Sequence, residues 1–545
     1  MKGAIRFGWI AGLTVAVVLA SAAAHGQEQD SAAAVQATQV QVNPGGIGAN
    51  WPTYNGDYTG RRYTRLDEIT PGNVANLHAA WVFHSRAAGT LEATPVVLNG
   101  VMYLTASNDA YALNAVDGQV LWHYARPISS GLVDDASGHI SRGVALWGHH
   151  LFMETDNAHL LCLDARSGHL IWDVSYASWN KNYGATSAPL VVHDKVIVGT
   201  SGGDDGVRGF IAAFDVRTGA LVWRHWTIPG PGERGSSSWP GQMYLHGGGT
   251  AWMPGTYDAE LNTLYWGTGN AAPDYDGSVR PGDDLYTASV LALDPDTGKL
   301  KWYFQFTPHD LYDYDGVETP VLVDTKDGSA PSHLLIEANR NGYLYVLDRT
   351  NGRFLSATPF AERLNWAKGI DANGRPIFTD VLPSDKGTLT CPGEAGATNW
   401  FSPSWNEKTH LYYFMALDEC TVNFRHPEEF QEGKEYYATG GHREANGASR
   451  KYLLAFDPAT KRFVWKYPQA GEGQSWGGVM STATGLVFFA DDSGSLEAVE
   501  GSTGKPLWHF NTGQTIHASP MSYAIAGQQY VAIASGDDLF TFTLH

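Results

Sequence analysis

The sequence predicts an all-β fold, an eight-bladed β-propeller with tryptophan-docking repeats. Two observations carry this prediction: a hairpin-like unit recurs along the chain, and the composition favours short strands and tight turns. The 545 residues include 62 Gly, 19 Trp and 26 Tyr, and only 17% are charged. Many glycines and aromatic residues with few charges are typical of repeat proteins built from antiparallel strands.

The repeated unit is an apolar strand, a polar residue that is usually Asp, a turn that usually contains Gly, and a Trp four residues after the turn. Asp accepts hydrogen bonds from turn amides and Gly reaches positive φ without strain, so each copy is expected to form a β-hairpin. The Trp ring can pack between neighbouring units, which stabilises units that cannot bury their own faces. A degenerate copy at 347–352 lacks the Trp. The other copies span 113–122, 163–172, 214–223, 293–302, 456–465 and 499–508.

Further apolar segments, such as 101–104 and 195–198, lie between the copies. Each unit therefore has room for four strands, the number in a propeller blade. Seven copies are visible, and Trp81 marks an eighth whose turn is missing. The C-terminal segments 530–534 and 539–542 lack a sequential partner, and pairing them with the N-terminal strand closes a ring of eight blades without free edges. The alternative is a smaller propeller with an extra domain.

The N-terminus is typical of a signal peptide. Lys2 and Arg6 precede an apolar stretch at 9–23, and 20–24 offers small-residue cleavage sites. A membrane anchor is the alternative, but the apolar stretch is short for a bilayer span. We expect a signal peptide at 1–26, a linker at 27–46, and the propeller at 47–545. The mature protein is then periplasmic.

The formal net charge of -20 argues against binding to a nucleic-acid backbone and favours a basic partner such as a small cytochrome. The chain has three cysteines. In an exported protein a pair is expected to form a disulfide. Cys391 and Cys420 flank one hairpin-like stretch, so we pair them and expect Cys162 to be a buried thiol. No Cys-x-x-Cys-His motif is present, so no c-type haem is expected on this chain.

An acidic run, Asp313-Tyr314-Asp315, carries the most specific chemical signal. Two carboxylates two residues apart on an extended segment point the same way. This arrangement suits a hard cation and a catalytic base better than a core. A solvated acidic loop is the alternative for the run taken alone.

Further motifs lie between the repeats, in loops longer than hairpins need. They are Gly247-Gly248-Gly249-Thr250-Ala251-Trp252, Ser141-Arg142-Gly143, Gly269-Asn270, Asn339-Arg340-Asn341 and Thr398-Asn399-Trp400. With these motifs, over roughly Trp51 to the C-terminus, the chain resembles the quinoprotein alcohol dehydrogenases. These are eight-bladed propellers that bind pyrroloquinoline quinone (PQQ) on the ring axis.

The resemblance implies which residues would hold PQQ, a flat molecule with three carboxylates and an ortho-quinone. Trp252 would form the floor under the rings, Arg142 would pair with a carboxylate, and Arg340 would lie beside the quinone oxygens. Trp252 could instead be a core residue, and Glu92 and Thr155 could be structural. The remaining candidate contacts are Glu92, Thr155, Ser201, Gly202, Gly203, Asn399, Trp400 and Trp476.

The resemblance also implies a metal site. Asn270 matches the asparagine ligand, Asp313 matches the catalytic aspartate, and Asp315 matches the extra carboxylate of the lanthanide-dependent members. A trivalent ion needs more negative charge and more oxygen ligands than Ca²⁺. The cofactors expected are therefore PQQ with either a lanthanide(III) ion or Ca²⁺.

Two positions depart from the family pattern. Asp204 stands where the family usually has Glu, one methylene longer, which leaves the choice between the two metals open. The stretch at 133–140 has no cysteine, although many alcohol-oxidising members carry a vicinal Cys-Cys there.

Taken together, the resemblance implies oxidation of alcohols to aldehydes in the periplasm by hydride transfer to PQQ, with electrons passed to a cytochrome c. Asp313 would be the general base. The alternatives are a Ca²⁺-dependent PQQ dehydrogenase of sugars or polyols, and a non-catalytic propeller scaffold.

Overall fold

A computed structural model describes residues 48–86, 89–325, 332–443, 449–471 and 475–545. The predicted signal peptide and linker lie outside these residues. Within them the chain is built almost entirely from antiparallel strands, as expected, and no described helix is long and apolar enough to cross a membrane. The short helices are α1 (Asp134–Ser137) and the 3-10 turns η1 (Val74–Asn76), η2 (Trp179–Lys181), η3 (Ser236–Ser238), η4 (Met243–Leu245) and η5 (Gly277–Val279).

Four sheets of four strands follow one another in the first part of the described chain, and in each the strands pair with their neighbours in sequence. The first holds β3 (Val96–Leu98), β4 (Val101–Ala106), β5 (Asp109–Asn114) and β6 (Val120–Tyr124). The second holds β7 (Ala145–Trp147), β8 (His150–Thr155), β9 (His159–Asp164) and β10 (Leu170–Ser175). The third holds β11 (Leu190–Val192), β12 (Lys195–Val198), β13 (Phe210–Asp215) and β14 (Leu221–Trp226). The fourth holds β15 (Thr256–Asp258), β16 (Thr263–Thr268), β17 (Ser289–Leu293) and β18 (Leu300–Gln305).

Three more large sheets follow along the chain. The fifth holds β19 (Val321–Asp324), β20 (His333–Ala338), β21 (Tyr343–Asp348) and β22 (Arg353–Pro359). The sixth holds β26 (Ser404–Asn406), β27 (Leu411–Asp418), β30 (Arg450–Asp457) and β31 (Arg462–Pro468). The seventh holds β32 (Val479–Thr482), β33 (Leu486–Ala490), β34 (Ser495–Glu500) and β35 (Pro506–Asn511), with β1 (Tyr63–Thr64) parallel to β32 at its edge.

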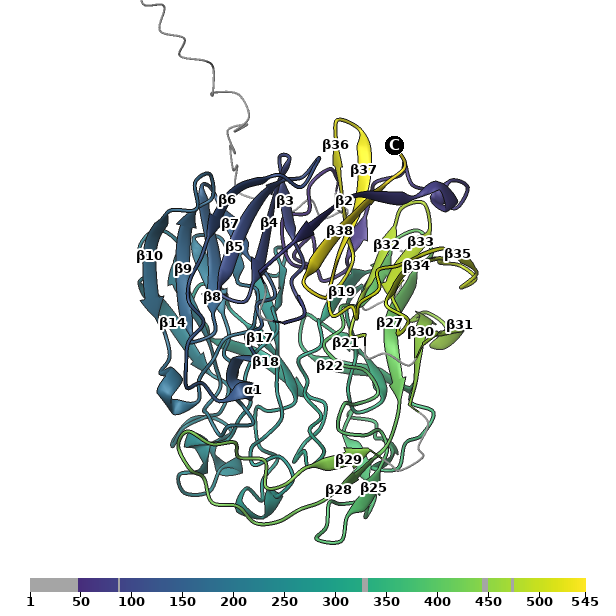
Figure 1. Ribbon diagram of the computed structural model, residues 1–545. Coiled ribbons are helices and arrows are strands. Elements are labelled where there is room, and N and C mark those ends of the chain that lie inside the picture. The colour runs from purple at the N-terminus through teal and green to yellow at the C-terminus, as the bar shows by residue number, and fades with distance from the viewer. Residues whose placement is uncertain (1–47, 87–88, 326–331, 444–448, 472–474) are drawn as a thin grey trace, which may run out of the picture. The chain divides into compact units, whose positions relative to one another are not determined.

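The last large sheet joins the two ends of the described chain. It holds β36 (Met521–Ile525), β37 (Gln528–Ser535), β38 (Asp538–Thr543) and, from the N-terminal side, β2 (His78–His84). β2 is antiparallel to β38, with His78 opposite Thr543 and His84 opposite Asp538. In Figure 1 the dark β2 lies beside the yellow β36–β38. The predicted pairing of the C-terminal strands with the N-terminal strand is confirmed: β2 covers β38 and is itself the outer strand of the sheet.

The chain between β22 and β30 adds two small sheets that the repeat pattern does not predict. One holds β23 (Ala367–Ile370) and β24 (Pro376–Phe378), and the other holds β25 (Thr388–Thr390), β28 (Thr421–Asn423) and β29 (Gly441–Arg443). Cys391 and Cys420 form a disulfide directly after β25 and before β28, which confirms the predicted pair. Cys162 is a buried free thiol, also as predicted.

The repeat Trp and Gly residues contact each other between neighbouring sheets. The Trp lies on the outer strand of one sheet, and the Gly lies in the last hairpin turn of the next. Gly298 shows the fit: its φ is +67°, and a Cβ on it would lie 2.5 Å from the Trp223 ring. The Trp223 indole N–H also donates to the Pro295 carbonyl of that turn (2.9 Å). The contact between ring and glycine also joins Trp81 to Gly118, Trp122 to Gly168, Trp172 to Gly219, Trp302 to Gly352 and Trp465 to Gly504.

Apolar side chains fill the space between successive sheets. One cluster joins the second sheet to the third through Phe152 and Phe210, and the next joins the third to the fourth through Ile211 and Trp266. Where the degenerate repeat lacks its Trp, the cluster around Ile336 and Phe414 joins the fifth sheet to the sixth. Such face-to-face burial is the main stabilising contribution in a repeat fold.

Candidate active site

All the predicted site residues lie at one end of the large sheets. In a four-stranded antiparallel sheet, the chain enters the first strand at the same end at which the second strand turns into the third. Every candidate except Thr155 lies in a loop before a first strand or in a loop between a second and a third strand. Thr155 is the last residue of a second strand, β8. The Trp-contacting glycine turns lie at the opposite end. The long loops therefore gather the site residues, although these are far apart in sequence.

Trp252, in the loop that leads into β15, has two arginines near its ring. The Arg142 guanidinium carbon is 5.0 Å from the centre of the Trp252 ring, and that of Arg340 is 5.9 Å from it. Arg142 is also 4.7 Å from the Trp400 ring. Trp252, Trp400 and Trp476 belong to one apolar cluster. The predicted floor and two of the predicted aromatic contacts are thus brought together with both predicted cations.

Arg142 is held by a buried ion pair. Its guanidinium lies 2.5 Å from a Glu92 carboxylate oxygen, and both side chains are at most 9% exposed. It also donates to the Thr186 carbonyl at 3.1 Å, while its Nε has no hydrogen-bond partner among the described residues. Burial raises the pKa of Glu92, and the neighbouring Arg142 opposes this rise. The pair therefore supplies a fixed cation with a free N–H beside Trp252.

Arg340, in the turn after β20, contacts both aspartates of the acidic run. Its guanidinium lies 2.7 Å from Asp315 and 3.5 Å from Asp313, and it donates to the Asp313 carbonyl at 3.1 Å. Asp315 in turn accepts hydrogen bonds from the Trp252 indole (3.2 Å) and from the backbone N–H of Asn270 (2.6 Å). One carboxylate thus links the floor, the cation and the predicted asparagine ligand.

Three carboxylates converge next to this network. Ligand oxygens of Asp204, Asp274 and Asp313 all lie within 4.8 Å of one another. Burial raises the pKa of Asp313 well above its usual range against the opposing effect of Arg340, and burial with the charges of Asp204 and Asp313 does the same for Asp274. Such mutual repulsion suits a bound cation.

Asp274 was missed by the sequence interpretation, which singled out Asp204 and Asp313 but not this third carboxylate. The only sequence signal is its place four residues after Asn270, at the end of Asn270-Ala271-Ala272-Pro273-Asp274. Asn270 itself is buried, and its side-chain Nδ2 has no hydrogen-bond partner within the described chain. The ligand roles predicted for Asn270 and Asp315 stay predictions.

The segment that holds Asp204 is packed against the Trp252 loop. A Cβ on Gly203 would lie 2.8 Å from the Thr250 hydroxyl, and a Cβ on Gly202, where φ is +90°, would lie 2.0 Å from the Asn182 carbonyl. The Ser201 hydroxyl donates to the carbonyl of Ala136. The close packing explains the glycines and places the turn of α1, in the stretch without cysteines, beside this segment.

Two candidates have side chains that bond within their own loops. The Thr155 hydroxyl donates to the Asn157 side chain (2.8 Å), and the Asn399 side chain donates to the Ala395 carbonyl (2.9 Å). Both residues are buried. Their predicted contacts with PQQ stay predictions.

The arrangement fits both groups that the sequence resemblance implies. A flat tricarboxylate requires an aromatic face and cations at its rim, and Trp252 with Arg142 and Arg340 provides these. A hard cation requires several carboxylate oxygens, and the converging aspartates provide them.

Comparisons with known proteins show the family to which the chain belongs. Residues 51–364 and 457–531 match the family model "PQQ: Glucose/ethanol/alcohol dehydrogenase, beta-propeller domain". The chain is 35% identical to the quinoprotein alcohol dehydrogenase PedH of Pseudomonas putida, over 88% of this chain and 84% of that one. It is 32% identical to the lanthanide-dependent methanol dehydrogenase of Methylorubrum extorquens, over 88% and 86% of the two chains.

Among solved structures, the quinohemoprotein alcohol dehydrogenase of Comamonas testosteroni superposes with a TM-score of 0.86 at 34% identity, over 91% of this chain and 80% of that one. A europium-containing methanol dehydrogenase superposes with a TM-score of 0.83 at 29% identity, over 91% and 98%. The large sheets therefore form a PQQ β-propeller domain, and the chain belongs to the family of PQQ-dependent quinoprotein alcohol dehydrogenases.

Proposed function

We propose that this protein oxidises alcohols to aldehydes in the periplasm and passes the electrons to a cytochrome c. The observation that carries the proposal is the position of Trp252. The guanidinium groups of Arg142 and Arg340 lie 5.0 Å and 5.9 Å from its ring centre, and its indole donates a hydrogen bond to Asp315. When bound, PQQ would supply the redox chemistry, as the acceptor of the hydride from the alcohol carbon.

The fold that presents these residues is an eight-bladed ring with tryptophan docking. The large apolar clusters each join one large sheet to the next, and the cluster that contains Met480, Val531 and Met102 joins the last two sheets in the chain to the first. The Trp508 indole donates to the Leu77 carbonyl, directly before β2 (3.0 Å). Both contacts support a closed ring over a smaller propeller with an extra domain.

Four residues of the chain have separate roles in this reaction. Trp252 provides the face on which the cofactor stacks, and Arg142 binds a carboxylate of it through the free Nε–H. Asp313 accepts the hydroxyl proton of the alcohol as the general base. Arg340 provides positive charge where negative charge develops on reduction, and its contacts with Asp315 and Asp313 fix it in place before the reaction.

The metal identity is part of this proposal. The cluster of Asp204, Asp274 and Asp313 supplies three negative charges, which favours a lanthanide(III) ion over Ca²⁺. These carboxylates would hold the cation, which would supply Lewis-acid chemistry to the site.

The test is reconstitution of the cofactor-free protein with PQQ and either La³⁺ or Ca²⁺, followed by assays of alcohols and of sugars with an artificial electron acceptor. We expect aldehyde formation from primary alcohols, faster with La³⁺. Activity on sugars but not alcohols would support the sugar or polyol dehydrogenase instead. Activity with Ca²⁺ alone would reject the lanthanide assignment, and no PQQ binding would favour the scaffold.

A further inference from the structure

We propose that Asp274 is a metal ligand, and that three carboxylates from three separate loops, those of Asp204, Asp274 and Asp313, hold a hard, highly charged cation. The inference rests on the proposed function only in taking the cation to be the one that accompanies PQQ. It adds a ligand that the acidic run and the sequence resemblance do not indicate.

The first step is convergence. Asp204 follows β12, Asp274 follows β16 and Asp313 follows β18, so no two of them are neighbours in sequence. Their ligand oxygens nevertheless lie within 4.8 Å of one another. Like charges at this separation in a partly buried site repel strongly unless a counter-charge lies among them.

The second step is the state of the Asp274 carboxylate. The residue is 0% exposed, and neither carboxylate oxygen has a hydrogen-bond partner among the described residues. Asp310, also 0% exposed, makes a direct comparison, because its carboxylate accepts backbone N–H bonds from Tyr312 and Tyr314. A buried carboxylate without such bonds is costly, and a cation at the cluster would remove that cost.

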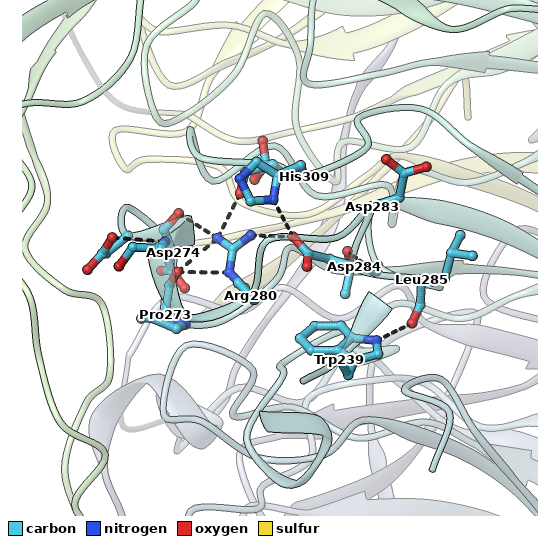
Figure 2. A network of polar contacts seen from close by, with 12 residues as sticks. Trp239, Pro273, Asp274, Arg280, Asp283, Asp284, Leu285 and His309 are labelled. Carbon is cyan, nitrogen blue, oxygen red and sulfur yellow. Dashed lines mark hydrogen bonds and ion pairs between the residues drawn. The ribbon is translucent and has the colours of Figure 1, made fainter. Parts of the chain in front are cut away.

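The third step is how Asp274 is held in place. Arg280 is fully buried, and Figure 2 shows it between the loop of Pro273 and Asp274 on one side and Asp284 on the other. It donates to the carbonyls of Pro273 (2.9 Å), Asp274 (3.1 Å) and Asp310 (2.8 Å), and to the Asp284 carboxylate (2.5 Å). The guanidinium thus fixes the backbone of Asp274 against the loop that leads to Asp313, while its hydrogen bonds go to carbonyls and to Asp284.

The fourth step compares Asp274 with Asp315. Both oxygens of Asp315 already have partners, which are Arg340 and Trp252 on one and the Asn270 amide on the other. Its charge is therefore largely balanced by Arg340. The charge of Asp274 is available to a cation, so Asp274 is the carboxylate that sets the charge of the site.

The test is metal binding to the full-length protein, measured by tryptophan-sensitised Tb³⁺ luminescence and by Ca²⁺ competition, with and without PQQ. The variant is Asp274→Asn, which keeps the shape of the side chain. The matched control is Asp276→Asn in the same loop, because the Asp276 carboxylate is also buried but caps η5 through the Ser278 amide and does not belong to the cluster.

We expect Asp274→Asn to weaken Tb³⁺ binding by roughly tenfold or more, since affinity for hard cations follows the number of charged ligands. Asp276→Asn should bind Tb³⁺ like the wild type. A thermal melt is the second readout: Asp274→Asn should not lower the melting temperature of the metal-free protein, because it removes a buried carboxyl group that lacks hydrogen-bond partners among the described residues and lies beside Asp204 and Asp313. It should reduce the rise in melting temperature that Tb³⁺ causes. If Asp274 instead stabilises the fold without binding a metal, metal-free Asp274→Asn should melt at a lower temperature than the metal-free wild type.

Wild-type Tb³⁺ affinity in Asp274→Asn would overturn the proposal, as would equal losses in Asp274→Asn and Asp276→Asn. These outcomes are separate from a failure of the proposed function. If the wild type binds Tb³⁺ and Asp274→Asn does not, the ligand assignment stands even when no alcohol is oxidised. If alcohols are oxidised while Asp274→Asn binds metal normally, only the ligand assignment fails.

Discussion

The Arg340 guanidinium lies 2.7 Å from the Asp315 carboxylate and also faces Asp313 and Glu318, at 3.5 Å and 3.8 Å. The side chains of Arg340, Asp315 and Glu318 are buried, and that of Asp313 is partly exposed. One cation therefore serves three carboxylates, and the four side chains do not contribute equally to stability. Removing one carboxylate leaves Arg340 with two partners, whereas removing Arg340 leaves three carboxylates without their cation.

The first prediction follows from this asymmetry. Arg340→Gln should lower the free energy of unfolding of the cofactor-free protein by about 3–5 kcal/mol, the usual cost of leaving buried charges unpaired. Asp315→Asn should cost clearly less. Urea denaturation at neutral pH measures both. Equal destabilisation by the two variants would show that Arg340 is not shared in this way.

The second prediction concerns the general base. Asp313→Asn should reduce alcohol turnover by about 10²–10⁴-fold, the typical contribution of a positioned base, while PQQ still binds. Reconstitution followed by a steady-state assay and a PQQ absorbance titration measures both quantities. The control is Asp283→Asn, because the Asp283 carboxylate is paired with exposed Arg375 and does not belong to the cluster, so turnover should be unchanged. Full turnover in Asp313→Asn would reject the assignment.

The third prediction concerns Arg142. Arg142→Gln should weaken PQQ binding by about 10- to 100-fold, because a hydrogen bond to a charged group contributes about 1.5–3 kcal/mol. A fluorescence titration with PQQ measures the affinity. Arg217→Gln is the control, since Arg217 also lies over a Trp ring, that of Trp147 at 4.6 Å, but on an exposed turn of the third sheet. An effect of similar size in both variants would attribute the loss to general cation–π packing.

Much of the fold was predictable because it follows from a local, repeated pattern. Each Asp-to-Trp unit specifies its own hairpin, and the contact of Trp223 with Gly298 between sheets follows from the same few residues. The closing strand pair of β2 with β38 was predictable because the C-terminal strands had no other partner. The small sheets around the disulfide were not predictable from the sequence, because they lie in the chain between β22 and β30, which lacks the repeat.

The site was predictable where a motif marks it and not where only three-dimensional convergence does. Trp252, Arg340 and the acidic run stand in distinctive segments, but Asp274 is a single acidic residue after a proline, a common turn sequence. Arg280 was missed for a similar reason: its hydrogen bonds go mainly to backbone carbonyls, which leave no side-chain signature. The contact of the Tyr436 amide with the Asp204 carbonyl (2.7 Å) joins residues more than 200 positions apart, beyond any local pattern.

The last prediction tests tryptophan docking with two glycines that share a backbone conformation. Gly298 has φ +67° and Gly527 has φ +88°, so an alanine at either position carries a similar strain of about 1–2 kcal/mol. A Cβ on Gly298 would lie 2.5 Å from the Trp223 ring, whereas a Cβ on Gly527 would meet nothing within 4 Å. Gly298→Ala should therefore lower the free energy of unfolding by about 1–3 kcal/mol more than Gly527→Ala, the usual cost of overpacking. Parallel urea denaturation of the two variants measures this difference. If both lose the same stability, backbone strain alone accounts for the cost, and the contact between Trp223 and the next sheet contributes little to holding the sheets together.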